Sequence, residues 1–166
     1  MTTRTHAPVP PGEGEALGWG GFGVVYKISG AVTGGAFAIV EHPMQPGVLA
    51  APPHTHTRED EITLVLEGEV GLQIGDDVFV AGPGTYVVKP RGVPHTFWNA
   101  GSVPARIQEI ITPAGFENYF RELAEILAAS NPPDLEKIGA LAARYGLTFH
   151  MERLEETLRT HGVGLM

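Results

Sequence analysis

The sequence predicts a mainly β domain, either a sandwich or a barrel, followed by a C-terminal α-helical extension. Between residues 18 and 112, short segments rich in β-branched and aromatic residues alternate with turns that contain Gly, Pro, Asn or Asp. From residue 115 onward the apolar residues instead recur at helical spacing. The length of 166 residues suits one domain with a single core.

Residues 1–17 are polar and rich in Pro and Gly, and we expect a flexible N-terminal arm there. This stretch has no apolar segment of the kind found in a secretory signal. The barrel is expected over residues 18–114. Residues 18–27 match the glycine loop of protein kinases, but the sequence contains no H-R-D or D-F-G motif. We therefore interpret them as an entry loop and a first strand.

The helical extension is expected over residues 115–166. Its first predicted helix has an apolar stripe formed by Phe116, Phe120, Leu123 and Leu127. A second helix is predicted within residues 132–145, and a third, shorter one within 151–162. We interpret this region as a packing appendage on the barrel or as a dimer contact.

Composition excludes several classes of protein. The chain has no cysteine, so it has neither disulfides nor cysteine-ligated metal sites, and we expect a cytoplasmic location. The formal net charge is −8 and no basic stripe is visible, which argues against a nucleic-acid partner. No apolar run approaches the roughly 20 residues that span a bilayer, so no membrane partner is expected.

Three histidines and one glutamate stand out as candidate metal ligands. His54 and His56 are separated by one residue, a spacing that puts both side chains on the same face of a strand. After the polar stretch TRED, Glu61 begins the next predicted strand, and His95 begins a later one. Imidazole nitrogen and carboxylate oxygen are usual ligands of first-row divalent metals. The residue types do not distinguish among Fe, Mn, Ni, Co, Cu and Zn.

The same residues lie within two motifs by which the chain is identified as resembling the cupin superfamily, over about residues 36–112. In the first motif, Gly47 is followed by VLAAPP, His-Thr-His, TRED, Glu, ITLVLE and Gly68, with one more residue than usual before the first histidine. In the second, Gly84 is followed by TYVVK, Pro-Arg-Gly, VP, His95, TFW and Asn99. The resemblance implies a double-stranded β-helix, a relative of the jelly roll. It also implies one divalent metal ion bound by His54, His56, Glu61 and His95.

Strand alternation extends the inward face beyond the ligands. If Glu61 points inward, so do Thr63 and Val65, and if His95 points inward, so does Phe97. These side chains predict a mostly apolar cavity for a small organic substrate. His42 could also reach this cavity, although the sequence does not settle its facing, and it is interpreted as a residue at a strand end rather than as a catalyst.

The outward face of the same strand carries Ile62, Leu64 and Leu66. A row this apolar needs cover, either from the C-terminal helices or from a second subunit. We therefore expect a homodimer, a common state among small cupins.

The ligand stretch is similar to that of quercetinase-like dioxygenases. This resemblance implies an oxidoreductase that acts on a flavonol or dicarbonyl-like substrate, with Glu61 as a ligand that also accepts a proton. Other small cupins are isomerases, lyases, cyclases or decarboxylases, and these activities remain alternatives. A third alternative is a metal- or ligand-binding module without catalysis.

Overall fold

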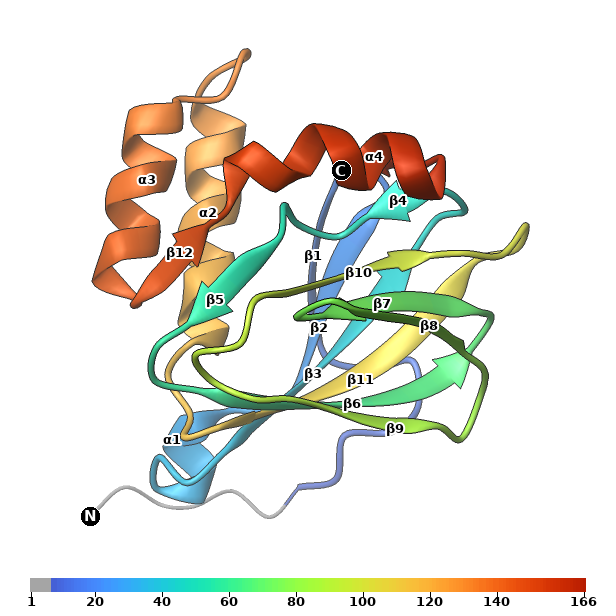
Figure 1. Cartoon of the computed structure of the whole chain (residues 1–166). Coiled ribbons are helices and arrows are strands. Elements are labelled where there is room, and N and C mark those ends of the chain that lie inside the picture. The colour runs from blue at the N-terminus through green and yellow to red at the C-terminus, as the bar shows by residue number, and fades with distance from the viewer. Residues whose placement is uncertain (1–6) are drawn as a thin grey trace.

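The computed structural model of the protein describes residues 7–166. Two β-sheets face each other around the core, two helices stand at one end, and a third helix crosses one side (Figure 1). The predicted mainly β fold with a C-terminal helical extension is confirmed. The two facing sheets are consistent with a double-stranded β-helix.

The first sheet has six strands in the order β1-β2-β3-β11-β6-β9, with every neighbouring pair antiparallel. The strands are β1 (Glu15–Trp19), β2 (Phe22–Ile28), β3 (Ala38–Met44), β11 (Ala105–Thr112), β6 (Asp60–Glu67) and β9 (Tyr86–Lys89). In β6 and β11 buried and half-buried residues alternate, because successive side chains point to opposite faces of a strand. One face of this sheet therefore looks into the barrel and the other looks outward.

The second sheet has seven strands, five of them in the order β12-β5-β10-β4-β13. Strand β7 pairs with the other side of β10, and β8 pairs with β7. The strands are β12 (Leu147–Phe149), β5 (His54–His56), β10 (His95–Asn99), β4 (Val48–Leu49), β13 (Gly164–Leu165), β7 (Val70–Ile74) and β8 (Asp77–Ala81). This sheet positions three of the four predicted metal ligands.

The N-terminal region departs from expectation at two points. Strand β1 begins at Glu15, so the last three residues of the expected arm (1–17) pair with β2. Residues 1–6 of that arm lie outside the described residues. A four-residue helix, α1 (Gly30–Thr33), fills the connection from β2 to β3 that was read as a turn, with Ser29 as its N-cap.

The C-terminal extension contains the three predicted helical regions. They are α2 (Glu117–Ala129), α3 (Leu135–Arg144) and the 3₁₀ turn η1 (Met151–Arg153) leading into α4 (Leu154–His161). Asp134 caps α3 by accepting a hydrogen bond from the backbone N–H of Lys137 at 3.1 Å. None of the helices in the described chain combines the length and the apolar character needed to cross a membrane.

The helical extension also supplies two short strands, which the sequence analysis did not predict. Strand β12 pairs with β5, and β13 pairs with β4 in parallel. The backbone N–H of Thr57 also bonds to the Gly146 carbonyl, and that of His150 bonds to the Pro53 carbonyl. The extension is therefore hydrogen-bonded into the sheet that carries the candidate ligands.

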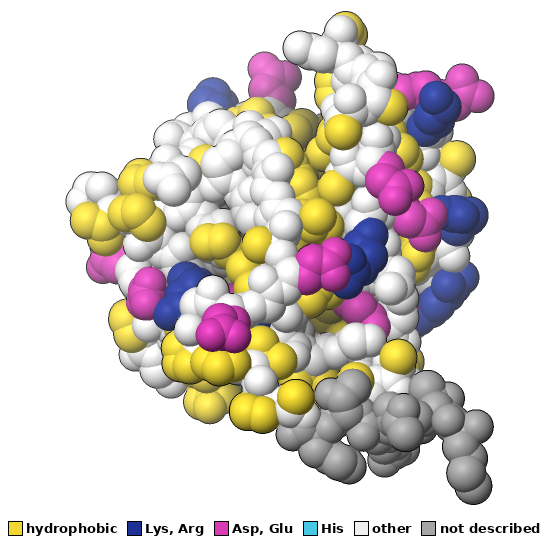
Figure 2. Space-filling view, turned by 180° about the vertical axis from the view of Figure 1, so that it is seen from behind, with side chains coloured by type: hydrophobic (Ala, Val, Ile, Leu, Met, Phe, Trp, Pro, Cys, Tyr) yellow, Lys and Arg dark blue, Asp and Glu magenta, His cyan; other side chains and the backbone are white. Residues whose placement is uncertain are grey.

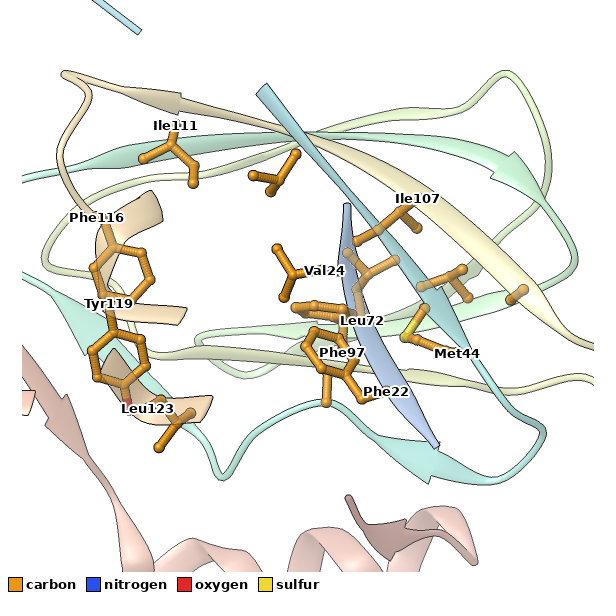
Figure 3. Close-up of a cluster of buried hydrophobic side chains, with 14 of the residues drawn as sticks. Phe22, Val24, Met44, Leu72, Phe97, Ile107, Ile111, Phe116, Tyr119 and Leu123 are labelled. Carbon is orange, nitrogen blue, oxygen red and sulfur yellow. The ribbon is translucent and has the colours of Figure 1, made fainter. Parts of the chain in front are cut away.

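The core joins the barrel to the extension. Val24, Met44, Leu72 and Ile107 pack inside the barrel, while Phe116, Tyr119 and Leu123 project toward them from the start and first turns of α2 (Figure 3). The two groups belong to one cluster of buried residues. Burial of α2 against the barrel thus follows from the apolar stripe predicted for it.

The outward apolar row is half-buried in the single chain. Ile62 and Leu64 pair with Val88 and Tyr86 of β9, whose side chains are 55% and 67% exposed. Helix α2 packs against β1, at the opposite end of this sheet, and α3 packs against α2 and β12. These contacts leave the row Ile62, Leu64 and Leu66 as the place where we still predict a homodimer.

Light scattering at micromolar concentration should therefore give twice the chain mass. Val88→Lys should shift the population toward monomer, because it places a charge directly beside the apolar row, opposite Ile62. Val103→Lys changes an equally exposed valine, 57% exposed, in the connection to β11 and should leave the dimer intact. A monomeric wild-type protein would contradict the prediction.

Gly71 permits close contact between two strands of the second sheet. It lies directly opposite Trp98, and a β-carbon at position 71 would collide with the indole ring. Gly71→Ala should lower the free energy of unfolding by about 1–3 kcal/mol in urea denaturation, the usual cost of overpacking. Gly82→Ala is the matched control, because a β-carbon there meets nothing within 4 Å. Equal stability of the two variants would contradict this account.

Candidate metal centre

The four predicted ligands converge from both sheets. His54 and His56 lie on one face of β5, and His95 begins β10 directly opposite His54. Glu61 is the second residue of β6 in the facing sheet. All four side chains are buried, and one ligand atom from each lies within 4.8 Å of the others. The structure therefore brings together the residues that the sequence selected.

Backbone carbonyls orient two of the imidazole rings. Nδ1 of His54 lies 2.8 Å from the Pro52 carbonyl oxygen, and Nδ1 of His95 lies 3.0 Å from the Val93 carbonyl oxygen. Because a carbonyl oxygen only accepts, each Nδ1 carries the proton and donates it. The lone pair is left on Nε2, the usual arrangement for a metal-ligating histidine.

His56 lies between two carboxylates instead. Its Nδ1 lies 3.5 Å from Oε2 of Glu59, and its Nε2 lies 3.6 Å from Oε1 of Glu61. Within the described residues, neither nitrogen of His56 has a hydrogen-bond partner, and neither does Nε2 of His95. Buried polar atoms without partners are uncommon. A cation held between Nε2 of His56, Nε2 of His95 and Glu61 would satisfy these two nitrogens, so the donor set fits a divalent metal.

The charge states also suit a cation. Burial lowers the pKa of His54 well below its usual value and lowers that of His95, so both rings are neutral. Burial alone would raise the pKa of Glu61, but the Lys89 ammonium and the neighbouring imidazoles bring it well below its usual value. Neutral imidazoles beside a charged carboxylate are the forms that bind metal.

Glu61 belongs to a buried chain of ion pairs. Lys89 Nζ lies 2.9 Å from Glu61 Oε2 and 2.6 Å from Glu109 Oε2, and Thr63 Oγ1 donates to Glu109 Oε1 at 2.8 Å. Burial raises the pKa of Glu109 to about 7, with Glu61 adding to the rise and Lys89 opposing it. Two carboxylates share one ammonium here, and Glu109 is the weaker acid of the two.

Sequence reasoning missed Lys89 and Glu109, although a signal was present. Glu109 lies in the inward row of β11 between Ile107 and Ile111, and all three residues are buried. Lys89 occupies the inward row of β9 together with Val87. An acid and a base in the apolar rows of two predicted strands would have suggested a buried pair.

A cavity of about 670 Å³ opens beside the ligands. Within the described chain, its barrel side includes His54, His56, Glu61, Phe97 and His42. Thr63 and Val65, which were also expected to line it, are buried elsewhere: Thr63 bonds to Glu109, and Val65 belongs to the apolar core. His42, which lies in β3, is part of the cavity wall, a position that the sequence had left open.

The C-terminal extension forms the other half of the wall. Helices α2 and α3 contribute Tyr119, Phe120, Leu123 and Ile138, and β12 contributes Phe149. On the face shown in Figure 2, hydrophobic side chains gather along the hollow between the upright helices and the barrel. Figure 3 shows Phe116, Tyr119 and Leu123 projecting from the extension toward Phe22 and Phe97 of the barrel. The extension therefore encloses the cavity beside the ligands.

Comparison of sequences identifies the barrel. Residues 40–111, which include strands β4 to β10, match the family model described as the cupin domain. Over 61 residues the chain is 41% identical to germin-like protein subfamily T member 2 of Arabidopsis thaliana and 43% identical to nectarin-1 of Nicotiana langsdorffii x Nicotiana sanderae. Each match covers 34% of this chain but only 28% and 27% of the relatives, so the chain spans less than a third of their length.

Comparison of structures supports the same fold. KdgF from Halomonas sp. matches with a TM-score of 0.60 and 17% identity, covering 68% of this chain and 98% of that one. An RmlC-like cupin from Shewanella frigidimarina matches with a TM-score of 0.56 and 17% identity, covering 66% and 93%. A predicted oxalate decarboxylase from Thermotoga maritima matches with a TM-score of 0.52 and 20% identity, covering 55% and 80%. At these identities the matches show the fold alone.

Lys89→Met tests the buried ion-pair chain. The change leaves two buried carboxylates without their ammonium, and the free energy of unfolding should fall by about 3–5 kcal/mol at pH 7. The deficit should shrink as the pH falls, because protonation of Glu109 and then Glu61 relieves the uncompensated charge. Urea denaturation of chelator-treated protein at several pH values measures both effects.

Arg91→Met is the matched control for Lys89→Met. It breaks the solvent-exposed ion pair with Asp60, 2.8 Å long, and should cost far less stability. Comparable losses in the two variants would mean that Lys89 does not stabilise the interior charges.

Proposed function

We propose that this chain is a metal-dependent enzyme that binds one divalent ion at His54, His56, Glu61 and His95. We further propose that it acts on a small organic substrate in the adjoining cavity, with dioxygenase chemistry as the first candidate. The observation that carries the proposal is the convergence of three imidazoles and one carboxylate at the inner end of an apolar cavity. Such a cavity with a few convergent polar groups is a typical ligand site.

The chain's own residues prepare this site. The carbonyls of Pro52 and Val93 hold two imidazoles with Nε2 toward the centre, and Lys89 compensates the charge of Glu61. When bound, a divalent metal of this kind supplies Lewis acidity or a place for dioxygen to react. The aromatic walls from Phe97 and Phe116 exclude water around the substrate.

Glu61 has two proposed roles, as a ligand and as a proton acceptor from the substrate. The low pKa of Glu61 suits the first role, because the carboxylate is charged at neutral pH. It weakens the second, because the ion pair with Lys89 stabilises the unprotonated form. Binding of the metal and acceptance of a proton by Glu61 therefore have to be measured separately.

The reaction class is tested by oxygen consumption with a flavonol and with a 1,3-dicarbonyl, on protein loaded in turn with Fe, Mn, Ni, Co, Cu and Zn. Substrate-dependent oxygen uptake with at least one metal supports a dioxygenase. Conversion of either substrate without oxygen uptake would instead indicate an isomerase, lyase, cyclase or decarboxylase. If the protein binds metal stoichiometrically but converts neither substrate, the result would favour a binding module without catalysis.

His56→Ala tests the ligand set. Protein purified without chelators should carry one metal ion per chain by elemental analysis, and the variant should lose it, because His56 supplies one of the four ligand atoms. His150→Ala is the control, because His150 lies outside the group and bonds to Thr55. Unchanged metal affinity in His56→Ala would refute the proposed ligand set.

Glu61→Gln separates the two roles of this residue. Three neutral imidazoles remain, so the variant should keep much of its metal while turnover falls by about 10²–10⁴, the usual contribution of a general base. Metal content and turnover should be measured on the same sample. If activity falls only in proportion to metal occupancy, Glu61 is a ligand and not a base.

A further inference from the structure

His42 lies in the wall of the cavity among aromatic rings. Its side chain is 2% exposed, stacks on Phe22 with ring centroids 4.8 Å apart, and meets Phe120 edge-on at 5.2 Å. Phe97 lies 6.1 Å away on the same side of the cavity as the metal centre. Buried polar atoms normally have hydrogen-bond partners, so a ring nitrogen of His42 without a partner in the protein would be available to a ligand.

One nitrogen of His42 is engaged and the other is available. Nδ1 lies 3.0 Å from the carbonyl oxygen of Gly23, so Nδ1 carries the proton and donates it. No other hydrogen bond of this ring is present within the described residues. The side-chain atoms that are both fully buried and without a partner belong to His56, Glu59 and His95. Nε2 of His42 has no partner in the described part of the chain and is not one of them, so it is not fully buried. Nε2 therefore has access to the cavity.

The available nitrogen can only accept a hydrogen bond. Burial lowers the pKa of His42 to about 4, with the nearby Lys89 ammonium acting in the same direction and the Gly23 carbonyl opposing it. The ring is neutral at pH 7 and, with its proton on Nδ1, presents a lone pair on Nε2. The Tyr119 hydroxyl in the opposite wall can donate or accept, so it discriminates less between ligands.

The rest of the cavity sets the kind of molecule that fits. Its volume of about 670 Å³ is in the range for a ligand of two or three rings. The walls near His42 are aromatic or aliphatic, with Phe120, Leu123 and Ile138 on the extension. A sugar or a small dicarboxylate would leave most of its polar groups unpaired against these side chains, which is costly.

We propose that His42 determines specificity, its Nε2 accepting a hydrogen bond from a hydroxyl of an otherwise apolar, aromatic ligand. The other end of this ligand lies against His54, His56, Glu61 and His95, so the inference rests on the cavity assigned under the proposed function. It does not require turnover. The ligand class is thus a hydroxylated, multi-ring aromatic compound rather than a carbohydrate or a short acid.

The test measures binding of 3-hydroxyflavone and of its 4′-hydroxy and 7-hydroxy derivatives to zinc-loaded protein by fluorescence titration. At least one derivative should bind about 5-fold tighter than 3-hydroxyflavone, the gain that one good hydrogen bond provides. His42→Phe should abolish this gain and keep the affinity for 3-hydroxyflavone within about 2-fold. Ile138→Ala, a wall variant without a polar atom, should weaken all three probes alike. Retention of the gain in His42→Phe would overturn the proposal, and so would failure of every flavonol to bind.

A second measurement needs no variant, in case loss of the bond to Gly23 impairs folding. Wild-type protein should prefer the favoured hydroxy derivative over the corresponding methoxy derivative, which cannot donate to Nε2. Equal binding of the two would overturn the proposal. The same preference should persist in chelator-treated protein at lower overall affinity. A failure of the metal proposal would therefore leave the hydroxyl preference intact, and the two inferences fail separately.

Discussion

The wholly buried Lys89 ammonium is the charge on which the interior of this barrel depends. It lies between Glu61 and Glu109, which come from two neighbouring strands, β6 and β11, while Lys89 itself comes from β9. Isolated carboxylates are costly to bury, so neither acid could remain charged in the barrel without this partner. By holding Oε2 of Glu61, Lys89 also directs that side chain toward the three imidazoles. The candidate metal centre thus depends on a contact that joins three neighbouring strands.

The two sides of the cavity follow from different kinds of sequence information. The ligands His54, His56, Glu61 and His95 could be predicted because a strand places alternate residues on one face and because two compact motifs carry them. Lys89 and Glu109 could not be assigned a role in the same way. Their meeting depends on pairings between strands that are distant in the sequence, Glu61 with Lys89 and Glu109 with Thr63.

The extension was predictable in its helices but not in its strands. Apolar residues recurring at helical spacing indicated α2, whereas β12 spans three residues and β13 two, too few to show any period. Thr63 was placed in the cavity because alternation gives the facing of a residue but not what fills the space in front of it. That space is taken by Glu109, and the open part of the interior lies toward the helices. The facing of His42 could not be settled for the same reason, since its aromatic neighbours come from β2, β10 and α2.

The pairing of β12 with β5 bears on how this chain could have diverged from other barrels of its kind. The shared domain ends at residue 111, yet the strand that carries His54 and His56 is flanked on one side by residues 147–149. The extension is therefore interleaved with the shared part and is not a separable module. A different C-terminal segment grafted onto this barrel would have to replace the lost backbone partners of β5. Otherwise the ligand strand would become an exposed edge strand with unpaired N–H and C=O groups, which is prone to aggregation. Exchange of whole segments between relatives is therefore constrained at the pairing of β12 with β5. Single substitutions in the cavity wall can change the bound ligand without disturbing this pairing.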